Sequence, residues 1–307
     1  MRTILQAEAP GSLMLFGEHA VLRGHLALVC AVDRRLRVRL TPREDARVEI
    51  HSELGTYRAS LGSLADAPRL RFVLAAVADT APRLPGGFSL EIDSDLRSDL
   101  GLGSSAAVTV ATLAALRAWA GIPHAPADLL AAARAVIRSV QGAGSGADAA
   151  ASIHGSIVAF RAEPLQAEPL GCLHPITAAY AGAKTPTAEV IQRVDAAREA
   201  RPALFDALFA LIGRVSEEAA SALRSGDSDA VGALMNLAQG LMEALGVCNA
   251  RLAELVYRLR GLPGIGGAKI SGAGLGDCAI GWGRAAPPPD FDAIVPLAMT
   301  PRGLALS

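Results

Sequence analysis

Gly101-Leu102-Gly103-Ser104-Ser105-Ala106-Ala107 stands directly before a long run of Ala and Leu residues. That run is apolar on nearly all sides, which predicts a buried helix over 104–120. Glycines let the backbone approach a bulky anion closely, and a helix N-terminus presents unpaired N–H groups with partial positive charge. The combination predicts a cradle for phosphate, so we expect the chain to bind a phosphorylated ligand.

Two common nucleotide motifs fit this stretch poorly. Residues 101–106 match the dinucleotide pattern G-x-G-x-x-A, but that fold needs a strand running straight into the first glycine. Here residues 94–100 intervene, and the first acid downstream, Asp128, falls inside a predicted helix rather than at a strand end. The Walker A pattern G-x-x-x-x-G-K-[ST] does not occur in the sequence. A simple glycine turn before a core helix would explain the glycines but not the paired serines.

The composition excludes several classes of protein. With 307 residues and 51% hydrophobic content, the chain is long enough for two domains with sizeable cores. A formal net charge of −1 argues against a general affinity for nucleic acid or for anionic membranes. The sequence contains no uncharged apolar run of 18 residues, the length that a transmembrane helix needs. Residues 1–10 lack the apolar core of a signal peptide. We therefore expect a cytoplasmic protein without a transmembrane helix.

Lysine is rare in this chain. Of the 29 basic residues, only Lys184 and Lys269 are lysines. Retention of Lys in an Arg-rich chain indicates places where a compact ammonium group is needed, with chance retention as the alternative. Lys269 precedes a glycine-rich segment, and the capping of a strand is the favoured interpretation for it.

Periodicity predicts a mixed arrangement of strands and helices. Alternation of apolar and polar residues predicts half-buried strands, and continuous apolar runs predict central ones. A Pro-punctuated stretch over 164–175 predicts a domain boundary. The expected strands are 26–32, 36–40, 48–50, 88–92, 156–160, 267–271 and 278–282. The expected helices are 104–120, 127–140, a short one from 145, and then 187–198, 203–225, 229–246 and 249–260.

Three further glycine-rich segments accompany the opening stretch, and each is weak evidence when taken alone. They are Pro10-Gly11-Ser12 leading to Gly17-Glu18-His19-Ala20-Val21, Gly144-Ser145-Gly146-Ala147-Asp148, and Gly272-Ala273-Gly274-Leu275-Gly276-Asp277.

In this order, the motifs resemble those of the galacto-, homoserine, mevalonate and phosphomevalonate (GHMP) kinase superfamily, and they are most similar to the mevalonate kinases. The resemblance spans residues 10–280, nearly the whole chain. It implies an α+β, two-domain GHMP kinase fold. Residues 1–165 would form a ribosomal-protein-S5-like α/β domain that binds ATP, and residues 166–307 a ferredoxin-like α+β domain, with the ligands in the cleft between them.

The resemblance also implies transfer of the ATP γ-phosphoryl group, with Mg²⁺, to the hydroxyl of a small molecule. The expected acceptor is mevalonate, converted to phosphomevalonate in isoprenoid precursor synthesis. Asp148 would be catalytic, holding or deprotonating that hydroxyl. The implied ATP-binding residues are Gly101, Leu102, Gly103, Ser104, Ser105, Ala106, Gly272 and Gly274. The implied substrate-binding residues are Glu18, His19, Thr185 and Thr187.

Several positions depart from the family pattern. Mevalonate kinases carry a Lys in the first motif where this chain has Ser12, and a Tyr where it has Arg23. The Mg²⁺-binding Glu expected eleven residues before Asp148 is replaced by Ile137. A hard cation prefers carboxylate oxygen, so the metal is expected to be held by Ser104 or Ser105, by the ATP itself or by another acid. Asp99 is, as a hypothesis, the candidate for that acid. The third motif carries Leu275 and Asp277 in place of an all-Gly run.

Two alternatives remain open at this point. The first is another GHMP kinase, acting on phosphomevalonate, homoserine or a sugar. The second is a non-catalytic ATP-binding relative that has lost the lysine and the metal carboxylate, an interpretation against which the retention of Asp148 weighs. Apolar helix faces in the C-terminal half make a homodimer reasonable.

Overall fold

The computed structural model describes residues 4–96, 100–286, 288–289, 291, 293–295 and 297–307. Within this part of the chain the strands form two sheets, one of eight strands and one of four. The larger sheet contains β1 (Leu5–Phe16), β2 (Ala27–Pro42), β3 (Arg47–Ser52), β4 (Gly55–Ser60), β5 (Phe88–Ser94), β6 (Ile157–Arg161), β7 (Gln166–Pro169) and β12 (Ala305–Leu306). The smaller sheet contains β8 (Ile176–Tyr180), β9 (Ile265–Ser271), β10 (Cys278–Gly283) and β11 (Ile294–Val295).

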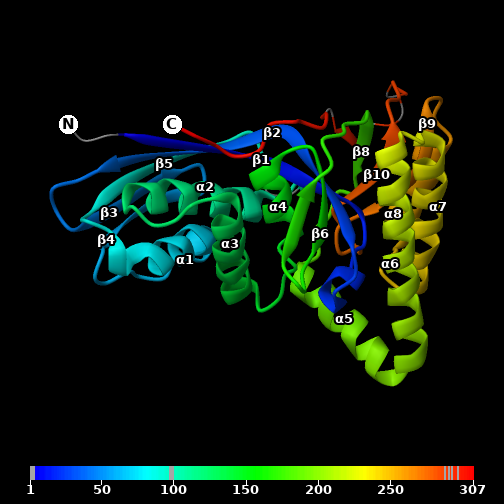
Figure 1. The fold of residues 1–307 in the computed structure, drawn as a ribbon, viewed down its shortest axis with the longest axis horizontal. Helices are drawn as coiled ribbons and strands as arrows, with labels where there is room; N and C mark the ends of the chain where they lie inside the picture. Colours follow the sequence, from blue (N-terminus) through cyan, green and yellow to red (C-terminus); the bar gives the residue numbers. More distant parts are fainter. Residues whose placement is uncertain (1–3, 97–99, 287, 290, 292, 296) are drawn as a thin grey trace.

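The larger sheet runs in the order β12-β1-β2-β5-β3-β4. β6 pairs with the first residues of β2, and β7 pairs with β6. Its neighbouring strands are antiparallel except for the parallel pair β3 and β5. The smaller sheet is antiparallel, in the order β11-β8-β10-β9. β12 pairs with β1, so the two ends of the chain lie together (Figure 1).

Helices pack against both sheets. They are α1 (Arg71–Thr80), α2 (Ser104–Trp119), α3 (Pro126–Gln141), α4 (Ala147–His154), α5 (Thr187–Ala200), α6 (Pro202–Ser225), α7 (Ser228–Ala244) and α8 (Ala250–Arg260), with 3₁₀ turns η1 (Ala20–Arg23), η2 (Pro68–Leu70) and η3 (Ala81–Arg83). α2 and α4 pack on β1 and β2, and α7 and α8 pack on β9. Figure 1 shows the two groups on opposite sides of the molecule, with α5 and the start of α6 projecting away.

α2 is buried on most of its surface, as its all-round apolar pattern predicts. Its small Ala residues, including Ala107, Ala111 and Ala114, are fully buried, so the helix lies close to the sheet beneath it. This close packing fixes the N-terminus of α2, and with it the glycine residues that precede the helix.

β1 and α1 were not predicted from the sequence. β1 contains Pro10 and Gly11, residues that disfavour a regular strand, and the structure accommodates them at a break in the β1–β2 register. A side chain at Gly11 would lie 2.5 Å from Leu96 Cδ2 and 2.6 Å from the Leu102 carbonyl, so the glycine allows β1 to pass beneath the start of α2.

The domain division at 165/166 stays a prediction. β7 and β12, which lie beyond that division, both join the larger sheet.

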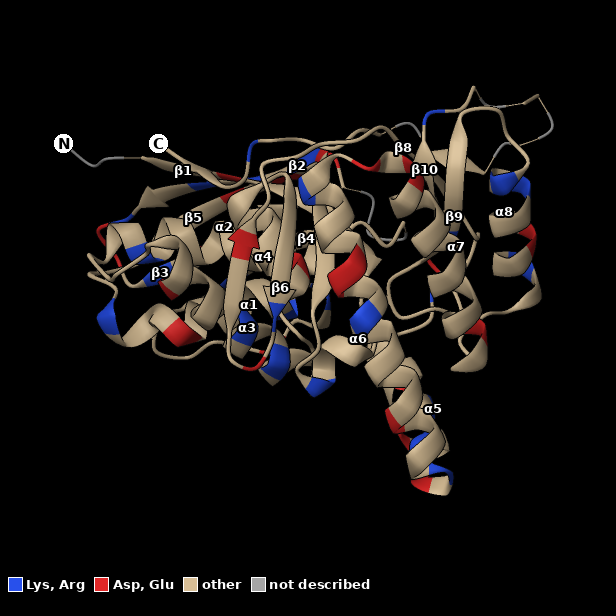
Figure 2. Ribbon diagram, turned by 45° about the vertical axis from the view of Figure 1, so that its right-hand side comes forward, with Lys and Arg blue, Asp and Glu red and all other residues tan. Residues whose placement is uncertain are grey.

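Charges of both signs are interspersed on the ribbon (Figure 2), in keeping with the net charge of −1. Among the described helices, none combines the length and apolarity needed to cross a bilayer.

Candidate functional site

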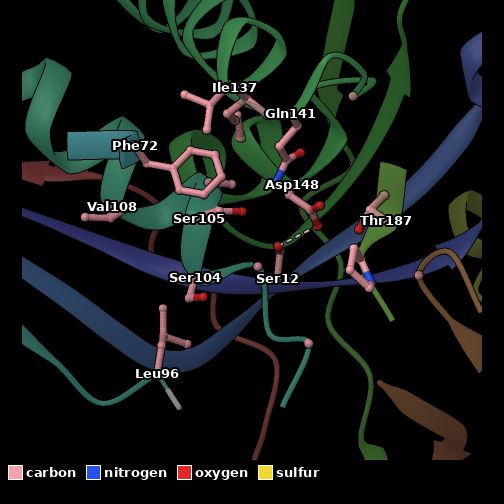
Figure 3. A pocket seen from close by; sticks show the side chains of 18 of the residues that line it. Ser12, Phe72, Leu96, Ser104, Ser105, Val108, Ile137, Gln141, Asp148 and Thr187 are labelled. Atoms are coloured by element: carbon pink, nitrogen blue, oxygen red, sulfur yellow. Dashed lines mark hydrogen bonds between the residues drawn. The ribbon is translucent and has the colours of Figure 1, made fainter. Parts of the chain in front are cut away.

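A cavity of about 790 Å³ lies where the two sheets meet, and all four glycine-rich segments of the sequence contribute to its wall. Figure 3 shows side chains from β1, α1, α2, α3, α4 and α5 converging on it. These residues are scattered over much of the chain, so only the fold brings them together.

The first wall is the glycine loop, defined as Gly101–Gly103, together with the start of α2. Gly101 and Gly103 both have φ of 67°, the left-handed region that favours glycine. A Cβ at Gly103 would lie 2.1 Å from the Ser12 Oγ, so the loop passes directly over β1. Ser104 and Ser105 face the cavity in the first turn of α2, where the N–H groups of a helix have no intrahelical partner. This wall can bind an anion.

Asp148 stands opposite, in the first turn of α4. Gly146, with φ of 97°, turns the chain into the helix, whose partial positive charge favours a carboxylate at this end. The buried Ser12 hydroxyl donates a hydrogen bond of 2.7 Å to Asp148 Oδ1 (Figure 3). Burial raises the pKa of Asp148, while the Ser12 hydrogen bond and the charge of Lys184 act in the opposite direction. A carboxyl group with a raised pKa is suited to accept a proton.

Glu18 and His19 follow β1 and line the cavity from the side of the smaller sheet. The Glu18 carboxylate forms a buried ion pair with the Lys269 ammonium of β9. His19 Nε2 lies 2.8 Å from the Ala273 carbonyl, so this nitrogen donates, and burial lowers the pKa of the imidazole. His19 is therefore a buried side chain that is hydrogen-bonded through one nitrogen and lines the cavity.

The C-terminal glycine segment, defined as residues 272–277, closes the same side. Asp277 has φ of 61° and is only 9% exposed. Its N–H donates to the Ala183 carbonyl at 2.9 Å, and its carbonyl accepts from the Ala181 N–H at 2.8 Å. These bonds tie the glycine segment to the loop that carries Lys184, and Lys184 also lines the cavity.

An apolar arm extends from the glycine loop on the side away from Thr187. Phe72 of α1, Val108 of α2 and Ile137 of α3 line it, together with Leu96 (Figure 3). Ile137 contributes a methyl-rich surface where the family resemblance places a carboxylate. The cavity thus has an apolar arm and a polar part, separated by the glycine loop and Asp148.

The sequence matches two families of known proteins. Residues 70–156 match the family described as GHMP kinases N terminal domain, and residues 219–293 match the family described as GHMP kinases C terminal. The mevalonate kinase of Aeropyrum pernix is 33% identical over 292 residues, which covers 92% of this chain and 89% of that protein. The chain belongs to the GHMP kinase family. The mevalonate kinase of Pyrococcus furiosus is also similar, at 32% identity over 89% of this chain and 87% of its own.

Solved structures support the two-domain GHMP kinase fold. The L. major mevalonate kinase in complex with R-mevalonate has a TM-score of 0.78 at 21% identity, covering 96% of each chain. The Lactococcus lactis galactokinase complexed with galactose has a TM-score of 0.82 at 17% identity, covering 98% of this chain and 95% of that one. At these identities the likeness concerns the fold alone. The family assignment and the mevalonate kinase relatives make this chain a small-molecule kinase.

Most residues predicted for the site line the cavity of this GHMP kinase. They are Glu18, His19, Gly101, Gly103, Ser104, Ser105, Ala106, Asp148, Thr187 and Gly272. Three others lie behind its wall. Leu102 is buried, and its carbonyl accepts a hydrogen bond from the Ser12 N–H. A side chain at Gly274 would meet Val247. The Thr185 hydroxyl donates to the Leu275 carbonyl at 2.9 Å. Asp99 lies outside the described residues.

Sequence reasoning gave no site role to Asp277 and set Lys269 at a strand cap. The cap interpretation is wrong, because Lys269 lies within β9, is fully buried and pairs with Glu18. The scarcity of lysine was a better indication of a role at the site. Lys184 lines the cavity, and Lys269 forms an ion pair with Glu18, which also lines it. The signal for Asp277 was its departure from the all-Gly pattern.

Proposed function

We propose that this kinase transfers the γ-phosphoryl group of ATP to the hydroxyl of mevalonate, giving phosphomevalonate. The observation that carries the proposal is the placement of Asp148, hydrogen-bonded to Ser12, across the cavity from the N-terminus of α2. The relatives named mevalonate kinase, 32–33% identical over about 90% of the chain, support mevalonate as the acceptor.

The nucleotide would lie along the glycine loop. Its phosphates would accept from backbone N–H groups of the loop and of the first turn of α2, where the helix dipole favours negative charge. The adenine ring would enter the apolar arm beside Phe72 and Val108, because a flat apolar ring gains by leaving water. Phosphates and base would then lie on connected parts of one cavity.

Mg²⁺ would accompany the nucleotide, and when bound it neutralises charge on the β- and γ-phosphates. The Ser104 and Ser105 hydroxyls fit this role as oxygen donors on the cavity wall. Ile137 offers no carboxylate from α3. Asp99 stays a prediction.

The acceptor would lie on the opposite side of Asp148 from the apolar arm, where Figure 3 shows Thr187. His19 and Glu18, which also line the cavity, would be available to contact it. Asp148 would accept the proton of the acceptor hydroxyl as the hydroxyl oxygen attacks the γ-phosphorus. The bond between the γ-phosphorus and the bridging oxygen would break, and ADP would leave. Ser12 would hold the carboxylate in place, and Lys184 would place a positive charge beside the transferring group. The main contributions of the protein would be positioning and electrostatic stabilisation, as phosphoryl transfer requires.

An acceptor panel tests this proposal. ADP release from ATP should depend on mevalonate and exceed release with phosphomevalonate, homoserine, galactose or no acceptor. Preferential turnover of another acceptor would replace mevalonate as the substrate. ATP binding without turnover of any acceptor would favour a non-catalytic relative. A role in isoprenoid precursor synthesis, a cytoplasmic location and a homodimer remain predictions.

A further inference from the structure

Asp277 is a buried carboxylate whose surroundings leave it incompletely satisfied. Its side chain lines the cavity although the residue is only 9% exposed. Among the described residues, its Oδ1 atom has no hydrogen-bond partner. Buried carboxylate oxygens are ordinarily paired, because leaving one unpaired loses the hydration that water would supply. The carboxyl group therefore lacks a full set of partners within the described part of the protein, and its side chain lies at the wall of the cavity.

The backbone holds this carboxylate in a fixed place. Left-handed φ angles at Leu275 and Asp277 turn the C-terminal glycine segment, and two hydrogen bonds tie Asp277 to Ala181 and Ala183. The side chain lies directly against the glycine loop. A Cβ at Gly101 would lie 2.6 Å from Asp277 Cβ, 2.7 Å from its Cγ and 2.9 Å from its Oδ1. The absence of a side chain at Gly101 makes room for the carboxylate.

This position creates an electrostatic conflict with the proposed nucleotide. The glycine loop is the wall along which the phosphates would lie, and a carboxylate beside them repels them unless a cation intervenes. Asp148 adds a second negative charge nearby, and Lys184 is the cation whose charge acts on both carboxylates. A bound triphosphate would add further negative charge to this corner.

A divalent cation resolves the conflict. Mg²⁺ is commonly held by one or two carboxylates together with phosphate oxygens and water. The described residues contain no group of three or more His, Cys, Asp or Glu side chains that could hold a metal on their own, so a cation here would have to be bound together with the nucleotide. Because Ile137 supplies no oxygen, we infer that Asp277 is the protein carboxylate that binds the divalent cation carried by the nucleotide. This inference rests on the proposed function in one respect, the presence of a nucleotide at the glycine loop.

The test measures cation binding rather than turnover. Binding of Mn²⁺ is followed by the electron paramagnetic resonance signal of the free ion, in the presence of saturating adenylyl imidodiphosphate, for the wild type and for Asp277→Asn. Asn accepts left-handed backbone angles and keeps the shape of the side chain. We expect Mn²⁺ affinity in the ternary complex to fall by about tenfold or more. Affinity for the analogue in EDTA should stay equal or rise, since a negative charge is lost.

Two further variants sharpen the result. Asp277→Gly, which also accepts the backbone angle, should lose Mn²⁺ affinity to the same extent and serves if the Asn variant fails to fold. Asp66→Asn removes an exposed carboxylate from the loop before η2 and should leave Mn²⁺ affinity unchanged. Unchanged Mn²⁺ affinity in both Asp277 variants, with the analogue bound, would overturn the inference and leave the proposed function standing. Failure of the wild type to bind the analogue would overturn both.

Discussion

The Ser12 hydroxyl and the Asp148 carboxylate are separated by 136 positions in the sequence, yet they form one hydrogen-bonded unit in the cavity. Burial raises the pKa of Asp148 and the Ser12 hydrogen bond opposes that rise. Ser12, at the position where the family resemblance places a lysine, is a neutral hydrogen-bond donor. The positive charge that acts on Asp148 comes from Lys184, on a different loop.

Replacing Ser12 by Ala should shift the pH dependence of turnover. Loss of a hydrogen bond that favours the ionised form raises the pKa of Asp148 further, so the acid limb of kcat moves to higher pH. A hydrogen bond to a charged group contributes about 1.5–3 kcal/mol, equivalent to a shift of about 1–2 pH units. The measurement is kcat against pH, with Ser225→Ala on α6 as the control. An acid limb that stays in place or moves to lower pH contradicts the assignment of Asp148 as the base.

Replacing Lys184 by Met should reduce kcat about tenfold to a hundredfold, because a positive charge beside the transferring group is lost. The acid limb should again move to higher pH, since Lys184 lowers the pKa of Asp148. Lys184→Arg should recover part of the rate. Arg193→Met, which removes an exposed cation from α5, is the matched control. Equal rates for Lys184→Met and this control would remove Lys184 from the mechanism.

At the residue scale, functional side chains that belong to a local motif could be predicted from the sequence. Contacts between side chains that are far apart in the sequence could not. The glycine-rich residues around them indicate the chemical roles of three residues, Asp148, Ser104 and Ser105. The contact of Ser12 with Asp148, and of Asp277 with Gly101, depends on how β1 and the C-terminal glycine segment fold around α2. No local spacing encodes those distances.

At the scale of elements, the glycine loop depends on backbone angles that only glycine adopts freely. Gly103→Ala should cost about 1–2 kcal/mol for the left-handed angle, and its Cβ would displace the Ser12 hydroxyl. Isothermal titration should show ATP affinity falling by about tenfold or more, because a small displacement of the loop misplaces its N–H groups.

Gly226→Ala is a control that carries the free-energy cost of the left-handed backbone angle without a clash of the new Cβ. Gly226 also has a left-handed φ, 75°, but a Cβ there would meet nothing within 4 Å. This variant should lose similar stability in thermal unfolding and keep wild-type ATP affinity. Equal ATP affinity in both variants would contradict the role given to the glycine loop.

The helices other than α1, and most central strands, were predicted within a few residues, because their apolar periodicity is regular. The predicted helices 187–198 and 249–260 correspond to α5 and α8, at 187–200 and 250–260. The predicted strands 26–32 and 36–40 are one continuous strand, β2, because Asp33 and the Arg residues after it lie at a polar interruption that the backbone crosses without a turn. β1 was missed because its Pro-Gly pair is typical of a loop.

At the scale of the whole molecule, the two sheets meet along β1 and β9. The Glu18–Lys269 ion pair, the Ser271 hydroxyl bonded to the Met14 carbonyl and the His19–Ala273 contact all lie on this junction. The family resemblance places the ligands between two domains, and no local pattern in the sequence shows which side chains join them.

Glu18→Gln should destabilise the fold by about 3–5 kcal/mol, because it leaves the Lys269 ammonium buried without its counter-charge. Burial already lowers the pKa of Lys269, and loss of Glu18 lowers it further. The unfolded chain then binds more protons below the ordinary pKa of lysine, so stability of the variant should rise as pH increases toward that value. Urea unfolding at several pH values measures the effect.

The double variant Glu18→Gln with Lys269→Met tests the same pair from the other side. Removing the second charge as well leaves no unpaired ion, so part of the lost stability should return. A double variant that is as unstable as the sum of the two single variants would mean that the two side chains act independently.

Asp148 is the residue on which the proposed phosphoryl transfer to mevalonate depends most. The most direct measurement follows the reaction by ³¹P nuclear magnetic resonance with ATP, Mg²⁺ and mevalonate, for the wild type and for Asp148→Asn. The wild type should produce ADP and a phosphate monoester of mevalonate in equal amounts. Asp148→Asn should bind ATP but turn over about 10²–10⁴ times more slowly. The proposed function would be contradicted if the wild type formed no phosphorylated mevalonate. The role of Asp148 would be contradicted if the Asp148→Asn variant formed it at the wild-type rate.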